Sequence, residues 1–114
     1  MIGFCYIINV YVEDFIMEII KNQNGDALEI SLEGRLDTTT APSLEAELKS
    51  SLNDVKSLVF NFQKLEYVSS AGLRVLLAAQ KVMSKQGTME ITNVSSEIME
   101  VFEITGFTDI LTIK

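Results

Sequence analysis

The chain has 114 residues, 47% of them apolar and 22% charged, which predicts one globular domain with an ordinary hydrophobic core. It contains no histidine, and this excludes a Ser-His-Asp triad, a His-paired cysteine nucleophile and a His-ligated zinc site. The single cysteine, Cys5, excludes a disulfide within the chain and favours a reducing compartment. The net charge of −7 disfavours nucleic acid and anionic membranes as partners; it favours a basic protein partner, or serves only solubility.

Residues 1–16, "MIGFCYIINVYVEDFI", are mostly apolar. The apolar run before Glu13 and Asp14 is shorter than the about 20 residues of a membrane-spanning helix, and we expect no membrane segment. The segment also lacks the basic start and the small-residue cleavage site of a secretory signal. Two interpretations remain open: an extra strand, or an extension in front of a domain that spans residues 17–114. An exposed apolar strand would also offer a pairing edge for a homodimer.

A hairpin of two strands is predicted next. Residues 17–21 form a short apolar strand, and Asn24-Gly25 is a strong signal for a tight hairpin turn. In residues 27–33 apolar and polar side chains alternate, which predicts a strand with one buried face. The buried face would carry Leu28, Ile30 and Leu32.

The segment "GRLDTTTAP" ends this strand and leads into a helix. Thr40 is placed to cap the helix, and Pro42 falls in the first turn, where its missing N–H has no cost. Leu44, Leu48 and Leu52 follow at four-residue spacing and form one apolar stripe. The helix is expected to end near residues 53–54.

A second strand and helix come after residue 56. Residues 57–62 read as a central strand, continued by "QKLEYV", and the period changes to that of a helix from Ser70. Gly87 is expected to end this helix. Its predicted inner face comprises Leu73, Leu76, Leu77, Ala79, Val82 and Met83.

The last elements are a strand over residues 88–94, a helix capped by Ser95 or Ser96 and ended by Gly106, and a short strand over residues 110–113. The inner face of that helix is predicted to hold Ile98, Val101, Phe102 and Thr105. The order ββαβαβαβ predicts an α/β fold, with helices packed on a mixed sheet of four to five strands.

The stretch "YVSSAGLRVLL" places Ser69 and Ser70 at a strand-to-helix turn. Exposed amide groups at a helix start favour an anion, so a phosphate on a serine here would be tolerated without melting the helix. The added charge would then act on whatever surface docks there. The simpler alternative is that Ser69 only caps the helix and Gly72 only permits close packing.

No enzyme motif accompanies these serines. The segment does not fit the nucleophile elbow G-x-S-x-G, and no Gly-rich phosphate-binding run is present. We therefore expect a binding protein and not an enzyme, with no catalytic residue, no metal and no cofactor.

The ordered segments "EGRLDTTTAPSLEAEL", "YVSSAGLRVLL" and "KQGTMEITNVSSEIMEVFEITGF" resemble the STAS domain, in particular the stand-alone bacterial anti-sigma factor antagonists. The resemblance extends from about residue 17 to residue 114. It implies the STAS fold, whose order of strands and helices is the one predicted above.

The resemblance also implies a mechanism of partner switching in the cytoplasm. Such proteins bind a partner that is both an anti-sigma factor and a serine protein kinase, and this binding frees a sigma factor. Phosphorylation of one serine releases the partner, and a separate serine phosphatase restores the antagonist. The alternative within the family is a scaffold or ligand-sensing module that is not phosphorylated.

Aligned on Gly72-Leu73, the family motif Asp-Ser-Ser/Thr-Gly-Leu places the phosphorylated serine at Ser70, with Ser69 as the alternative acceptor. Ser69 stands where the family has aspartate, which leaves kinase recognition open. Asp37 matches the acidic residue of the family's Gly-Glu-Leu/Ile-Asp turn. Leu73 is expected to supply apolar contact, and Arg74 either binds a phosphate or acidic group or is merely solvated. The expected partner-binding set is Asp37, Thr38, Thr39, Ser69, Ser70, Gly72, Leu73 and Arg74.

Overall fold

The structure, a computed structural model, describes residues 4–12 and 15–114, with side chains from Met17 onward. Its strands are β1 (Phe4–Val12), β2 (Phe15–Asn24), β3 (Ala27–Leu36), β4 (Ser57–Val68) and β5 (Thr88–Thr92). Its helices are α1 (Ala41–Ser51), α2 (Ser70–Gln86), α3 (Ser96–Thr105) and the short 3-10 helix η1 (Phe107–Asp109). None of the helices in this part of the chain is long and apolar enough to cross a bilayer.

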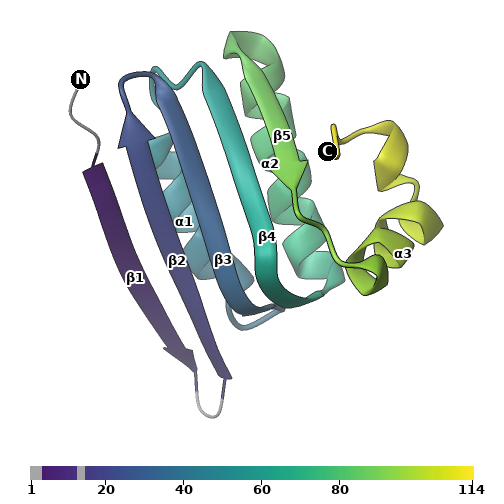
Figure 1. Ribbon diagram of the computed structural model, residues 1–114. Coiled ribbons are helices and arrows are strands. Elements are labelled where there is room, and N and C mark those ends of the chain that lie inside the picture. Colours follow the sequence, from purple (N-terminus) through teal and green to yellow (C-terminus); the bar gives the residue numbers. More distant parts are fainter. Residues whose placement is uncertain (1–3, 13–14) are drawn as a thin grey trace.

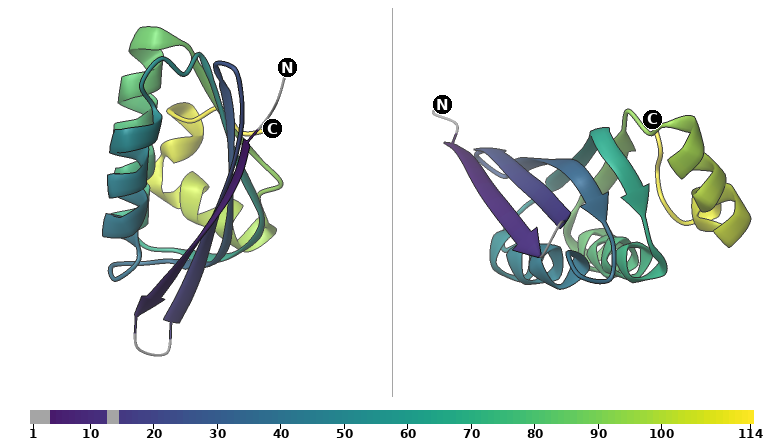
Figure 2. Two further views of the ribbon diagram at one scale, coloured as in Figure 1. Left: turned by 90° about the vertical axis from the view of Figure 1, so that its left-hand side faces the viewer. Right: turned by 90° about the horizontal axis from the view of Figure 1, so that it is seen from below.

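The five strands form one mixed sheet in the order β1-β2-β3-β4-β5 (Figure 1). The first three are antiparallel neighbours, whereas β3–β4 and β4–β5 are parallel. Parallel neighbours need a crossover, and α1 and α2 supply it. Both helices lie on the same face of the sheet, and α3 lies beyond β5 (Figure 2). The predicted α/β class and the mixed sheet are confirmed.

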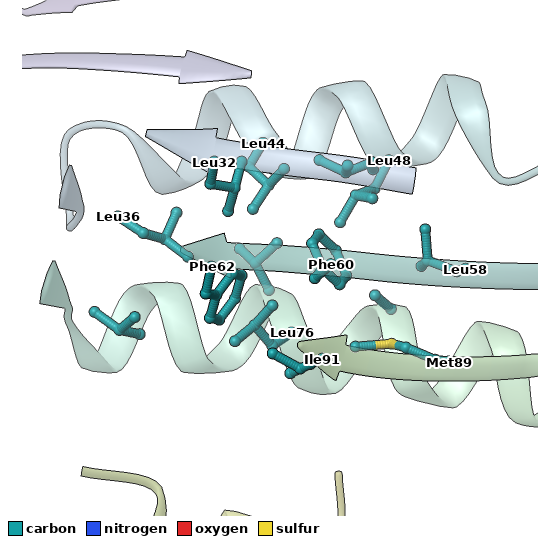
Figure 3. Packing of buried hydrophobic residues seen from close by; sticks show 14 of the residues in the cluster. Leu32, Leu36, Leu44, Leu48, Leu58, Phe60, Phe62, Leu76, Met89 and Ile91 are labelled. Carbon is teal, nitrogen blue, oxygen red and sulfur yellow. The ribbon is translucent and has the colours of Figure 1, made fainter. Parts of the chain in front are cut away.

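The core fills the space between the sheet and these two helices (Figure 3). The alternation predicted for β3 is confirmed, because its buried residues are Leu28, Ile30, Leu32 and Leu36. In β4 the rings of Phe60 and Phe62 lie 5.9 Å apart and are fully buried. The predicted stripe of α1 is also buried: Leu44, Leu48 and Leu52.

The C-terminal end of α2 is joined to the end of α1. The side-chain amide of Gln86 donates to the carbonyl of Leu52 at 2.6 Å and to that of Val55 at 2.8 Å. Leu52 is the C-cap residue of α1, and Val55 lies in the loop that follows it. Gly87 follows at the helix end and lies directly against the backbone of Lys56.

The inner face of α2 differs from the prediction at Val82, which is 43% exposed. The buried stripe runs through Gly72, Leu76, Ala79 and Met83 and is flanked by Leu73 and Val75. Val82 lies off this stripe and lines a groove between α1 and α2. The prediction was wrong because Val82 was assigned to the core on its apolar character, although its angle on the helix places it at the margin of the buried face.

The strand predicted over residues 110–113 is not formed. Residues 107–109 turn into η1 instead, and Ile110 is 46% exposed. What remains of the predicted pairing is an isolated parallel bridge between Ile113 and Ile91 of β5. Gly106 adopts a left-handed conformation (φ 80°), which ends α3 as predicted and begins the 3-10 turn.

Candidate functional site

The predicted site residues meet where β3 and β4 end. Because these strands are parallel, the loop after β3 and the start of α2 lie at the same edge of the sheet (Figure 1). The backbone amide of Ser69 donates to the carbonyl of Leu36 at 2.8 Å, which joins the two segments. We call this region the serine edge; it comprises residues 37–40, 69–70 and 74.

Ser69 is the N-cap of α2. Its backbone is extended (φ −92°, ψ 175°), and its Oγ accepts a hydrogen bond from the backbone amide of Gly72 at 3.3 Å. A serine side chain at this position satisfies one of the amides that a helix start leaves unpaired. The capping role suggested by the sequence therefore belongs to Ser69.

Ser70 is the first residue of α2 and is exposed. Its hydroxyl makes no hydrogen bond within the part of the chain that the structure describes. The amides and the dipole of a helix start favour negative charge at this position. Ser70 thus offers an accessible hydroxyl, whereas the Ser69 hydroxyl is half-buried and engaged.

Asp37 organises the loop after β3. Its Oδ1 accepts hydrogen bonds from the amide of Thr39 at 3.0 Å and its hydroxyl at 2.7 Å, and from the amide of Thr40 at 3.1 Å. Burial raises the pKa of Asp37, but these hydrogen bonds outweigh it and hold the pKa below its ordinary value. The carboxylate is therefore charged at neutral pH and serves as a structural acceptor, with only 9% of the residue exposed.

Thr40 and Arg35 take part in this arrangement, although neither was predicted from the sequence to belong to the site. The buried Thr40 hydroxyl donates to the carbonyl of Arg35 at 2.8 Å and accepts from the amide of Asp37 at 2.9 Å. The guanidinium of Arg35 lies 4.4 Å from the ring centroid of Tyr67 and its Nε lies 3.8 Å from Asp37 Oδ2. The sequence signal was only Arg35 beside Asp37, since the stacking partner belongs to another strand.

Three of the expected partner-binding residues are exposed at this edge besides Ser70: Thr38, Thr39 and Arg74. Leu73 is 6% exposed and lies in the core, so its expected apolar contact with a partner stays a prediction. Gly72 is also buried, and a Cβ there would lie 2.7 Å from Leu36 Cγ. Gly72 packs the start of α2 closely against Leu36 of β3, and Leu73 belongs to the core beneath it.

Among the residues that the structure describes, no group of three or more Cys, Asp and Glu side chains could hold a metal ion. What the serine edge does offer is an accessible hydroxyl at a helix start, next to a loop that is hydrogen-bonded around the Asp37 carboxylate.

Comparisons with known proteins agree with this fold. The sequence model of the STAS domain matches residues 18–114. The anti-sigma-B factor antagonist of Bacillus subtilis is 29% identical over 93 residues, which cover 81% of this chain and 85% of that protein. A Bordetella bronchiseptica protein named "Putative anti-sigma factor antagonist BtrV" is 34% identical over 96 residues, covering 82% and 83% of the two chains.

Solved structures show the same fold. An anti-sigma factor antagonist from Mycobacterium paratuberculosis superimposes with a TM-score of 0.79 at 20% identity, covering 91% of this chain and 89% of that one. The anti-sigma factor antagonist SpoIIAA in its unphosphorylated form gives a TM-score of 0.70 at 18% identity, with 96% and 88% covered. The phosphorylated form of SpoIIAA, from Bacillus, gives 0.64 at 18% identity, with 96% and 91% covered.

Proposed function

The chain belongs to the STAS domain family, and on this premise we propose that it is an anti-sigma factor antagonist whose partner binding is switched by phosphorylation of Ser70. The antagonist role is that of its relatives in Bacillus subtilis and Bordetella bronchiseptica. The phosphorylation switch has a precedent in SpoIIAA, which is known in both phosphorylated and unphosphorylated forms.

The difference between the two serines carries the assignment of the acceptor. A kinase needs a hydroxyl that it can reach, and Ser70 is exposed and without a hydrogen bond among the described residues. Modification of Ser69 would instead remove the bond from the Gly72 amide to Ser69 Oγ that caps α2. Ser70 is therefore the acceptor that we propose, and Ser69 is the alternative that a mapping experiment must exclude.

A phosphate on Ser70 would change the charge of the serine edge and not its shape. It adds about 1.5 to 2 negative charges at a helix start, where the dipole and the backbone amides tolerate them. Arg74 lies one turn further along the same exposed side, at the i+4 position where opposite charges attract. Asp37 is anionic on the neighbouring loop, so a partner that docks there would meet a more acidic surface after phosphorylation than before.

The partners follow from the same proposal. An anti-sigma factor that is also a serine protein kinase would bind the unphosphorylated chain and later phosphorylate it, and a serine phosphatase would reverse this. The chain itself would act in the cytoplasm as a binding protein and not as an enzyme. The sequence supports this role, because it has no histidine and none of the nucleotide-binding motifs considered above.

The direct test begins with a pull-down that uses the unphosphorylated chain as bait in a lysate of its source organism. The kinase-type partner that it retains is then incubated with the chain and ATP, and the phosphopeptide is mapped. We expect the label on Ser70. A label only on Ser69 would reassign the acceptor, and a label outside both residues would overturn the site.

Three variants then separate the switch from a mere loss of folding. Ser70→Ala should bind the partner like the parent chain and fail to be released by ATP, whereas Ser70→Asp should bind at least about fivefold more weakly, as in a coupling of 1 kcal/mol. Ser69→Ala, the matched control, should still be phosphorylated and released. Equal affinity of the Ser70→Asp chain and the parent chain would favour a STAS scaffold that is not switched by phosphate.

A further inference from the structure

The outer edge of β1 is an open strand edge within the described residues. β1 stands at one end of the strand order and pairs with β2 alone (Figure 1). It is nine residues long, "FCYIINVYV", and contains no proline and no charged residue. Natural edge strands are usually short, charged, bulged or covered, because an open edge pairs with other strands. β1 shows none of these protective features.

The opposite edge of the sheet, at β5, is short and partly covered. β5 has only five residues, and the C-terminal segment lies along its outer side (Figure 1). The amide of Ile91 donates to the carbonyl of Thr112 at 2.9 Å, and the amide of Lys114 donates to the carbonyl of Ile91 at 2.9 Å. Within the described residues, the chain thus occupies the hydrogen-bonding groups of Ile91 on one edge and leaves those of the β1 edge available.

We propose that β1 pairs with β1 of a second copy of this chain, in the antiparallel direction, to give a closed dimer with a continuous ten-stranded sheet. Two identical strands can pair in this way about a two-fold axis perpendicular to the sheet, so that each copy contributes the same surface. β1 contains no charged residue, so another uncharged strand, such as β1 of a second copy, suits it better than a charged strand would. The net charge of −7 on each chain therefore resides outside the paired strands. Growth stops at two copies because the β5 edge is covered at Ile91.

This arrangement keeps both serine edges accessible. The two-fold axis reverses the strand direction, so the ends of β3 and β4 in the two copies point to opposite ends of the assembly. The helices α1 and α2 of both copies lie on the same face of the sheet (Figure 2 shows one copy). The pairing does not depend on the phosphorylation of Ser70, and it is tested on the unmodified chain.

The first experiment measures mass by sedimentation equilibrium from about 1 µM to about 1 mM, the range of ordinary reversible association. We expect a transition toward twice the 12.7 kDa of one chain. Asn9→Lys should raise the dissociation constant by about tenfold or more, since it places a lysine of each copy in the paired edge. It should leave the monomer folded, because residue 9 is in register with Glu18 of β2.

The matched control is Asn22→Lys, which makes the same change of residue and charge on β2. Residue 22 is in register with Glu29, so the new lysine again faces a glutamate, but it lies one strand away from the edge. This variant should associate like the parent chain. If both variants weakened the dimer equally, the cause would be the change in net charge, and the assignment of the interface to β1 would be overturned.

Amide hydrogen exchange provides a second readout that does not depend on a variant. In an edge strand only alternate amides bond to the neighbouring strand, so alternate amides of residues 4–12 should exchange fast in dilute solution. Those amides should become protected as the concentration rises into the dimer range. A monomer at every concentration, or a dimer without this protection in β1, would overturn the proposal.

Discussion

The backbone amide of Ser69 donates a hydrogen bond to the carbonyl of Leu36 at 2.8 Å. This bond connects the last residue of β3 to the cap of α2, and it places the acidic loop that begins at Asp37 beside the accessible hydroxyl of Ser70. The serine edge is therefore one structural unit, although its two segments are separated by α1 and β4 in the chain.

Ser69 and Ser70 should differ in their effect on stability. Ser69→Ala removes the side-chain acceptor of the Gly72 amide, and we expect the free energy of unfolding to fall by about 1 kcal/mol. Ser70→Ala removes an exposed hydroxyl with no hydrogen bond in the described structure, so its effect should stay within about 0.5 kcal/mol. Urea denaturation of both variants measures the difference. Equal losses would contradict the assignment of Ser69 as the cap.

Asp37 should make the stability of the protein depend on acid pH. The pKa of Asp37 is lower in the folded chain than its ordinary value of 3.8, so the folded state binds this proton less readily than the unfolded state. The carboxylate therefore stabilises the fold above about pH 4, and this contribution is lost as the pH falls through the folded-state pKa. Unfolding curves of the parent chain and Asp37→Asn should converge at low pH. Asp54→Asn, an exposed control, should run parallel to the parent chain over the same range.

Gly72 should not accept a larger side chain. A Cβ at this position would lie 2.7 Å from Leu36 Cγ and 3.1 Å from the Leu36 carbonyl oxygen. We expect Gly72→Ala to reduce the free energy of unfolding by about 1–3 kcal/mol, as for other overpacked cores. Repeating the change in a Leu36→Ala background checks the cause, because the clash with the side chain is then absent. Strictly additive losses would show that Leu36 is not the obstacle.

Leu73 and Arg74 are neighbours in sequence with opposite roles. Leu73→Ala should cost about 2–5 kcal/mol of stability, the range for a buried leucine, and leave a core cavity. Arg74→Ala should stay within about 0.5 kcal/mol, because the side chain is exposed. Thermal unfolding gives the stabilities, and binding to the kinase-type partner gives the second readout. A loss of partner affinity in Arg74→Ala at unchanged stability would assign the contact surface to Arg74.

Local signals in the sequence predicted the elements that depend on local chemistry. Asn24-Gly25 predicted the hairpin between β2 and β3, and Thr40 with Pro42 predicted the start of α1. The start of α2 at Ser70 was also predicted, because two small polar residues lie between an apolar strand and an apolar helix. The STAS resemblance then predicted which turn carries the candidate site. The match of the family model to residues 18–114 confirms that family.

The features that were missed depend on contacts between distant segments. Val82 was assigned to the core on its apolar character, but the packing of α2 on the sheet decides which stripe is buried. Residues 110–113 have a strand-like composition, but the left-handed turn at Gly106 and the 3-10 turn after it leave room only for one bridge. Likewise the stacking of Arg35 on Tyr67 requires that β3 and β4 be neighbours, which no local pattern states.

Both ends of α2 lie so close to neighbouring residues that neither end could move nearer to them. At its start a Cβ on Gly72 would meet Leu36, and just after its end a Cβ on Gly87 would lie 2.8 Å from Lys56 Cα. The Gln86 amide further ties this end to α1, so the two helices form one body with the sheet beneath them. We therefore expect phosphorylation of Ser70 to leave the backbone of this scaffold unchanged. A partner would have to detect phosphorylation of Ser70 by direct contact, as a change of charge on a surface of unchanged shape. The phosphorylated and unphosphorylated forms would superimpose everywhere except at the phosphate itself.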